Sequence, residues 1–83
     1  VIIQNRLGVH ARPAALLVKE AARFRSEVFI AKNGLEVNGK SIMGVMMLAA
    51  EKGSEIEIRV EGADAAEALS ALLALIDSGF GED

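Results

Sequence analysis

Two parts of the chain alternate between apolar and polar residues in the way a strand with one buried face does. Residues 55–61 alternate without a break between charged residues and Ile or Val, which is typical of a half-buried strand. The opening residues 1–4 are apolar up to Gln4 and resemble the end of another strand. The inward-facing residues of the 55–61 strand are expected to be Ile56, Ile58 and Val60.

A β-hairpin is predicted in the first half of the chain. Residues 27–32 are rich in β-branched and aromatic side chains, and the run Leu35-Glu36-Val37-Asn38 is expected to form the second strand. Asn33 and Gly34 stand between them. Asn-Gly is a strong hairpin signal, because both turn residues must tolerate positive φ.

Two longer stretches show the spacing of an amphipathic helix. In residues 12–25 the apolar positions recur every three or four residues, which predicts a helix with one buried face. A second helix is predicted to begin at Asp64 and to end at Gly79, a favoured residue after a helix C-terminus. Glu67 follows Asp64 at the spacing of a capping box.

The stretch 41–50 also predicts a helix, capped by the Ser41 hydroxyl. It is apolar on almost every side, and a helix this short cannot bury all of them. We therefore expect an exposed apolar patch suited to docking a partner. The alternative is that its methionines fill gaps in the core, and the two interpretations have equal weight. The expected patch consists of Ile42, Met43 and Met46 or Met47, with Leu16 of the first helix as a further partner contact.

The predicted order of elements is βαββαβα. Strands and one-sided helices in this order indicate an α+β fold with two layers, in which helices cover one face of a single antiparallel sheet. The 83 residues are expected to form one domain, residues 1–83. Repeats, linkers and low-complexity segments are absent from the sequence.

Composition narrows the function. The chain has no cysteine, which excludes disulfides and thiolate metal sites, and no apolar run of the roughly 20 residues that span a bilayer. The net charge is −3, but residues 1–50 carry seven Lys and Arg against three Asp and Glu, and residues 51–83 carry two against nine. Such asymmetry orients docking partners. Nucleic-acid binding is a weaker hypothesis, because the chain is acidic overall and lacks Tyr and Trp for base stacking.

The strongest chemical signal is the stretch Gly8-Val9-His10-Ala11-Arg12-Pro13-Ala14, which holds the only histidine and the only proline. Proline is favoured in the first turn of a helix, so His10 is placed at or just before a helix N-terminus. Free backbone N–H groups there attract anions, and a guanidinium such as that of Arg12 suits phosphate oxygens. A phosphoryl group carried on imidazole fits these residues. The alternative is a surface histidine with Arg12 paired to a carboxylate.

Three segments of the sequence resemble the family of HPr, the histidine-containing phosphocarrier of the bacterial phosphoenolpyruvate:sugar phosphotransferase system. They are Leu7-Gly8-Val9-His10-Ala11-Arg12-Pro13-Ala14, Lys40-Ser41-Ile42-Met43-Gly44-Val45 and Ser78-Gly79-Phe80-Gly81. The resemblance covers the whole chain. It implies an open-faced β-sandwich, with a four-stranded antiparallel sheet in the order 1-4-2-3 and three helices on one face. Because the chain begins a few residues later than the family usually does, we expect a short first strand.

The resemblance also implies a function. His10 would accept a phosphoryl group on Nδ1 (the pros nitrogen) from phosphorylated enzyme I, charged by phosphoenolpyruvate, and pass it to an enzyme IIA for sugar uptake. Arg12 would neutralise the phosphate during transfer. Ser41 matches a serine that a dedicated HPr kinase/phosphorylase modifies in many relatives, which links it to a catabolite-control transcription regulator. A neutral imidazole is a good nucleophile, and phosphoryl transfer depends mainly on positioning and charge neutralisation.

The resemblance implies a cytoplasmic carrier rather than an autonomous enzyme, with no metal or cofactor of its own, no direct contact with nucleic acid and no insertion into a membrane. A monomer is expected, because successive partners must reach one small face. Two other functions stay open. One is a nitrogen-type carrier, with which the tail Gly81-Glu82-Asp83 is compatible, although the sequence around Ser41 favours the sugar branch. The other is a non-catalytic regulatory module that acts through Ser41 alone.

Overall fold

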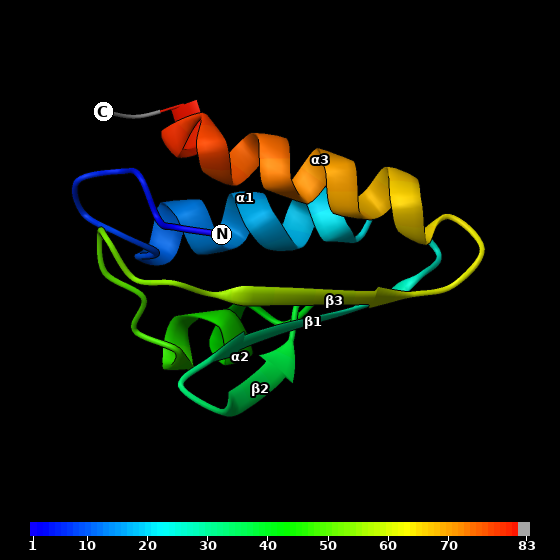
Figure 1. The fold of residues 1–83 in the computed structure, drawn as a ribbon, viewed down its shortest axis with the longest axis horizontal. Coiled ribbons are helices and arrows are strands. Elements are labelled where there is room, and N and C mark those ends of the chain that lie inside the picture. The colour runs from blue at the N-terminus through cyan, green and yellow to red at the C-terminus, as the bar shows by residue number, and fades with distance from the viewer. Residues whose placement is uncertain (82–83) are drawn as a thin grey trace.

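A computed structural model describes residues 1–81 and leaves Glu82 and Asp83, part of the acidic tail considered above, outside the described residues. Figure 1 shows helices stacked over a small sheet. The elements are α1 (Ala11–Ala21), β1 (Glu27–Lys32), β2 (Leu35–Asn38), α2 (Ile42–Met47), β3 (Glu57–Glu61), α3 (Ala65–Asp77) and a 3-10 turn η1 (Gly79–Gly81).

The sheet has three antiparallel strands in the order β2-β1-β3, so the expectation of four strands in the order 1-4-2-3 is wrong. The opening residues form no strand. They meet the chain before β3 in one isolated bridge between Ile2 and Glu55. Neighbouring backbone bonds join Ile3 N to Ser54 O at 3.0 Å and Gly53 N to Ile3 O at 2.9 Å. These contacts, with the mutual bonds between Val1 and Ile56, fix the segment in place. The paired stretch is nevertheless too short for a regular ladder, since the chain bends at residues 5–7 and turns at residues 52 and 53.

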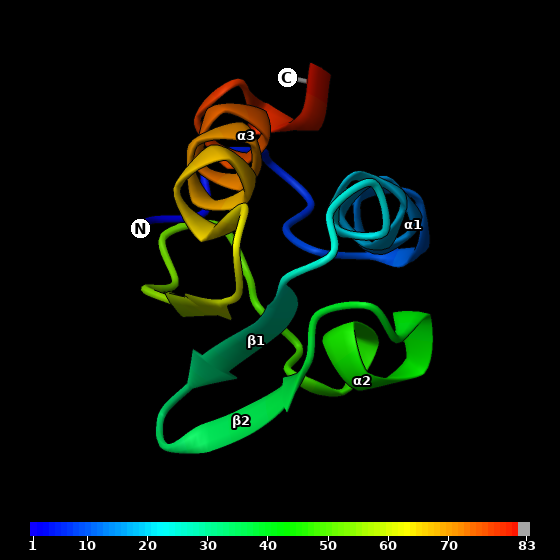
Figure 2. The same ribbon diagram turned by 90° about the vertical axis from the view of Figure 1, so that its right-hand side faces the viewer.

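The hairpin is confirmed. Its turn residues have positive φ, 51° for Asn33 and 85° for Gly34, and Lys32 pairs with Leu35 directly beside the turn. Alternate residues of the sheet face the helices, and Val28 and Ile30 of β1 are fully buried there. Figure 2 shows the three helices on the same side of the sheet.

The core lies between that sheet face and the helices. Its largest members come from both halves of the described chain and form one packed cluster. They are Ile3, Leu17, Ile30, Ile56, Leu72, Ile76 and Phe80.

The other sheet face is open, and a charged cluster covers its aromatic ring. The Arg59 guanidinium lies over the Phe29 ring, 4.1 Å from its centroid, and forms ion pairs with Glu36 at 2.8 Å and with Glu61. The hydrogen bond from Arg59 lowers the pKa of Glu36. A cation stacked on a ring covers apolar surface and keeps its own charge in water.

Two predicted helices are shorter than expected. Helix α1 ends at Ala21 rather than at residue 25, and helix α2 ends at Met47 rather than at residue 50. After α2, Ala49 has φ of 50°, which a right-handed helix cannot include. After α1, the N–H groups of Arg25 and Ser26 both donate to the Asp64 carboxylate, at 2.9 Å each. That contact holds the segment in its bend before β1.

The expected capping role of Asp64 is therefore wrong. Its side chain makes no cap bond to α3 and instead accepts from the two backbone N–H groups and from the Ser26 hydroxyl. These donors, the Ser26 hydroxyl first, lower the pKa of Asp64 to about 2. The carboxylate ties the start of α3 to the loop that follows α1, a connection between distant segments that no local sequence pattern reports.

Replacing Asp64 by Asn is expected to lower the melting temperature by an amount that depends on pH. The folded-state pKa, about 2, lies below the ordinary value of 3.8. The carboxylate therefore stabilises the fold fully above its unfolded pKa, and the contribution is lost as pH falls through about 2. Thermal melts of both proteins from pH 7 to pH 2 should converge at the acid end. Asp77→Asn, which removes a charge from the last turn of α3, is the control. If the difference in melting temperature between the two proteins does not become smaller in acid, the stabilising role of the Asp64 carboxylate is contradicted.

Candidate functional site: the start of α1 and the surface of α2

His10 is the N-cap residue of α1. Its backbone is extended, with φ of −89° and ψ of −165°, and its carbonyl accepts the first helical bond from Ala14 N at 2.9 Å. The side chain makes no cap bond to the helix and is half-exposed. The prediction that His10 stands at a helix N-terminus within reach of solvent is confirmed.

The backbone beneath His10 is fixed from two sides. Val9 N donates to Ala50 O at 2.7 Å, which anchors the loop to the segment after α2. Gly8 has φ of 71°, and a Cβ atom there would stand 2.4 Å from Ala50 O. Asn5 is fully buried and donates from Nδ2 to Gly8 O at 2.6 Å. The loop that presents His10 is therefore held in one conformation by close backbone contacts.

Arg12 is exposed in the first turn of α1, two residues after His10, and Pro13 beside it is buried. The first turn contains no acidic residue. Its backbone N–H groups and the Arg12 guanidinium thus form a positive environment around the start of the helix. Such a setting favours the binding of an anion.

Ser41 caps α2 as predicted, accepting a hydrogen bond from Gly44 N at 3.1 Å. The residue is half-exposed. Lys40 before it donates from Nζ to Phe24 O at 2.9 Å, linking the approach to α2 with the loop after α1. The helices α1 and α2 are in contact, and Figure 1 places the start of α1 and the end of α2 at the same end of the molecule.

The exposed apolar patch predicted on α2 is present. Met43 is the most exposed of its side chains, at 74%, and the alternative in which the methionines fill the core is wrong for all three. Leu16 is half-buried and packs against the core, so the structure gives it less free surface than the α2 residues. We use the name "α2 patch" for the exposed residues Ile42, Met43, Met46 and Met47.

Sequence reasoning missed two residues near His10. Leu7, in the turn before His10, is 68% exposed. Turns at the surface usually carry polar side chains, so an apolar residue at this position was the available sequence signal. Nothing in the local sequence pattern around Asn5 indicates its burial against Gly8 and Gly79.

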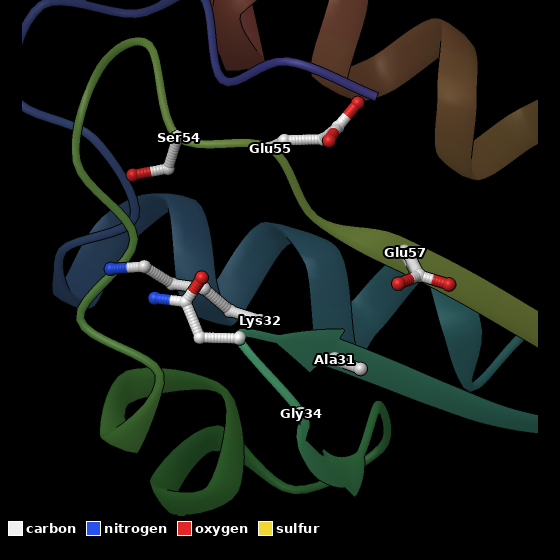
Figure 3. A pocket seen from close by; sticks show the side chains of 7 residues that line it. Ala31, Lys32, Gly34, Ser54, Glu55 and Glu57 are labelled. Carbon is white, nitrogen blue, oxygen red and sulfur yellow. The ribbon is translucent and has the colours of Figure 1, made fainter.

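A separate hollow of about 390 Å³ lies beside the hairpin turn. Its lining does not include His10, Arg12 or Ser41. Figure 3 shows the Lys32 side chain directed toward the loop before β3 and away from Glu57, and its Nζ donates to Ala49 O at 3.0 Å. The hollow is therefore distinct from the His10 site. The residues that line it are Ala31, Lys32, Asn33, Gly34, Ser54, Glu55 and Glu57.

Nothing in residues 1–81 forms a helix long and apolar enough to cross a membrane. The same residues contain no group of three or more His, Asp or Glu side chains placed to hold a metal ion.

Known proteins with similar sequences are described as HPr or HPr-like proteins. A phosphocarrier protein HPr from Neisseria meningitidis is 55% identical over 80 residues, covering 96% of this chain and 90% of the relative. One from Treponema pallidum is 52% identical over 83 residues, covering 100% and 94%. An HPr-like protein Crh from Halalkalibacterium halodurans is 53% identical over 77 residues, covering 93% and 92%.

Solved structures of HPr and Crh proteins also match this chain. HPr from Thermoanaerobacter tengcongensis matches with a TM-score of 0.96 and 46% identity, covering 100% of this chain and 93% of that chain. Crh from Bacillus subtilis, described as a swapped dimer, matches with a TM-score of 0.82 and 47% identity, covering 95% and 91%. The family model described as the PTS HPr component phosphorylation site matches residues 1–78. The chain therefore belongs to the HPr family of phosphocarrier proteins of the phosphotransferase system.

Proposed function

We propose that His10 accepts a phosphoryl group from phosphorylated enzyme I and passes it to a histidine of an enzyme IIA. The observation that carries this proposal is the position of His10, half-exposed at the N-terminus of α1 on a rigidly held loop. Transfer to and from two proteins needs an imidazole that both can reach. Nδ1 of His10 attacks phosphorus as the bond to the donor atom of enzyme I breaks. The histidine of the enzyme IIA then attacks phosphorus, and the bond to Nδ1 of His10 breaks.

This chain's contribution to the reaction is orientation and charge. The N–H groups of the first turn of α1 and the Arg12 guanidinium stabilise the phosphoryl oxygens as the charge on them changes. The α2 patch, adjoining α1, supplies the apolar contact for docking, so that each partner brings its histidine to His10. The partner supplies the remaining groups around phosphorus. The carrier acts in the cytoplasm, where phosphoenolpyruvate is made.

The direct test is phosphoryl transfer followed by intact mass. The protein is incubated with phosphoenolpyruvate and a catalytic amount of enzyme I, with and without an enzyme IIA. Gain of one acid-labile phosphoryl group, and its loss to the enzyme IIA, is the expected result. A protein that gains none with a competent enzyme I would contradict the proposal. Enzyme IIA proteins of the sugar and nitrogen systems, tested side by side, distinguish the two branches.

Arg12→Ala is expected to slow transfer by about a hundredfold without affecting the fold. The side chain is exposed, so its loss leaves the core intact, but the oxygens of the phosphoryl group lose a cation during transfer. Rapid-quench rates with enzyme I and thermal melts measure the two effects. Lys19→Ala, an exposed cation in the last turn of the same helix, is the matched control. Equal slowing in both variants would point to net charge rather than to Arg12.

A second function is regulation through Ser41, favoured by its half-exposed position beside the α2 patch and by the similarity to Crh proteins. We propose that an ATP-dependent HPr kinase/phosphorylase modifies Ser41 and that the product binds a catabolite-control transcription regulator. The kinase is tested by intact mass, with Ser41→Ala as the control.

Ser41 variants separate its capping role from its role at the surface. Ser41→Ala is expected to cost about 1 kcal/mol of stability, because Gly44 N loses its acceptor. Ser41→Asp keeps a capping oxygen and adds negative charge at a helix N-terminus, so stability should be retained. The same charge beside the α2 patch should slow transfer about tenfold. Unchanged transfer in Ser41→Asp would exclude a charge effect on docking.

The carrier is proposed to work as a monomer, since docking at the His10 end needs no second copy. Relatives include a structure described as an HPr dimer from Thermoanaerobacter tengcongensis. Sedimentation across a range of concentrations, combined with the transfer assay, decides the active form.

A further inference from the structure

All the methionines of this chain lie on the surface of one short helix. The sequence has three methionines and no Cys, Trp or Tyr. The three are in α2, with 74% of Met43, 67% of Met47 and 42% of Met46 exposed. Methionine usually fills gaps in a core, where it is protected. Here the side chains of the protein that are most readily oxidised are open to solvent.

Two of the three thioethers are more accessible than the third. Met43 and Met47 are four residues apart and so occupy the same side of α2. Met46 shares another side with Ile42, and both are markedly less exposed. Oxidation requires contact between sulfur and the oxidant, and susceptibility therefore follows exposure. Met43 and Met47 should react before Met46.

We propose that Met43 and Met47 are a reversible oxidation site that controls docking through the α2 patch. The oxidant is hydrogen peroxide. A sulfur lone pair attacks one peroxide oxygen, and an S–O bond forms as the O–O bond breaks. The departing hydroxide takes up the proton of the transferred oxygen and leaves as water. Sulfur loses two electrons and peroxide gains them. A methionine sulfoxide reductase reverses the step with two electrons from thiols, releasing water.

The consequence rests on the proposed function, in which partners dock on the α2 patch. A sulfoxide is polar and accepts strong hydrogen bonds, so burying it against an apolar partner costs its hydration. His10 keeps its chemistry and its position, because Met43 and Met47 are surface residues of another helix. Oxidation should therefore weaken docking and lower the rate of transfer at low partner concentration by about tenfold. The effect should appear mainly in KM.

The experiment compares the protein before and after limited peroxide treatment, and again after treatment with methionine sulfoxide reductases. Peptide mass mapping locates each added oxygen atom, circular dichroism checks the fold, and transfer from phosphorylated enzyme I gives kcat and KM. The matched control is the double variant Met43→Leu/Met47→Leu, which keeps apolar side chains at these two positions that peroxide cannot modify. The rates of the double variant after peroxide treatment are compared only with its own rates before treatment.

The expected result is oxidation at Met43 and Met47 ahead of Met46, a rise in KM that the reductases reverse, and no change in the double variant. The proposal is overturned if fully oxidised protein transfers as well as untreated protein. An equal loss in the double variant would overturn it too, since the damage would then lie elsewhere, and so would a loss that accompanies unfolding. If the untreated protein accepts no phosphate, the proposed carrier function itself is overturned, whatever the oxidation map shows.

Discussion

The His10→Ala variant should accept no phosphoryl group from enzyme I, while the unmodified protein is charged in full. His10 is the only histidine of the chain, so no second imidazole can replace it. The fold should survive, because the side chain is half-exposed and does not cap α1. The change in stability is expected to stay within about 1 kcal/mol. Intact mass and a thermal melt measure the two results.

A transfer experiment with the same variant separates the carrier from a regulatory module. If the protein acts through His10, His10→Ala blocks phosphoryl flow to the enzyme IIA, and Ser41→Ala does not. If it acts only through Ser41, the pattern in cells is reversed. Residual acid-labile phosphate on His10→Ala would contradict the assignment of His10 as the acceptor.

Gly8→Ala should be the most damaging single change in the loop that carries His10. The residue has φ of 71°, and a new Cβ atom would stand 2.4 Å from Ala50 O and 2.8 Å from Glu51 Cα, both backbone atoms. A left-handed conformation costs an alanine roughly 1–2 kcal/mol, and the clash adds about 1–3 kcal/mol more. The loop must shift, and a displaced His10 should transfer about a hundredfold more slowly.

The chain provides a matched control for this prediction in Gly34. Its φ is 85°, but no atom lies within 4 Å of the position that a Cβ atom would occupy there. Gly34→Ala therefore meets only the conformational cost and should leave transfer by His10 unaffected. Thermal melts and transfer rates of the two variants measure the difference. Equal destabilisation of both would mean that the contact between Gly8 and Ala50 adds nothing.

Local patterns in the sequence predicted the parts of the fold that local physics decides. The Asn33-Gly34 turn, the Ser41 cap and the exposure of His10 each depend on a few neighbouring residues. The end of α1 did not follow from its pattern, because Asp64, far along the chain, captures the N–H groups of Arg25 and Ser26. The fourth strand is absent for a different reason, since residues 1–3 pair with residues 53–56 over too short a stretch between two turns to form a regular ladder.

The site was predictable to the same extent. His10 and Arg12 are two positions apart in sequence, so an argument from the helix start was enough to place them. Because α2 is apolar on almost every side, its sequence pattern could not decide which of its side chains are exposed. The structure identifies them. The burial of Asn5 could be seen only in the packed molecule, because it involves Gly79 at the opposite end of the chain.

The Asp64 contact also has a consequence for the order in which the chain folds. It joins residues 38 and 39 positions apart in sequence, so it forms only when α3 and the loop before β1 have reached their final places. Contacts of such long range are made late, after the entropy of closing the intervening loop has been lost. The amides of Arg25 and Ser26 should therefore be the last in their loop to gain protection from hydrogen exchange during refolding. Asp64→Asn should raise the unfolding rate and leave the folding rate nearly unchanged.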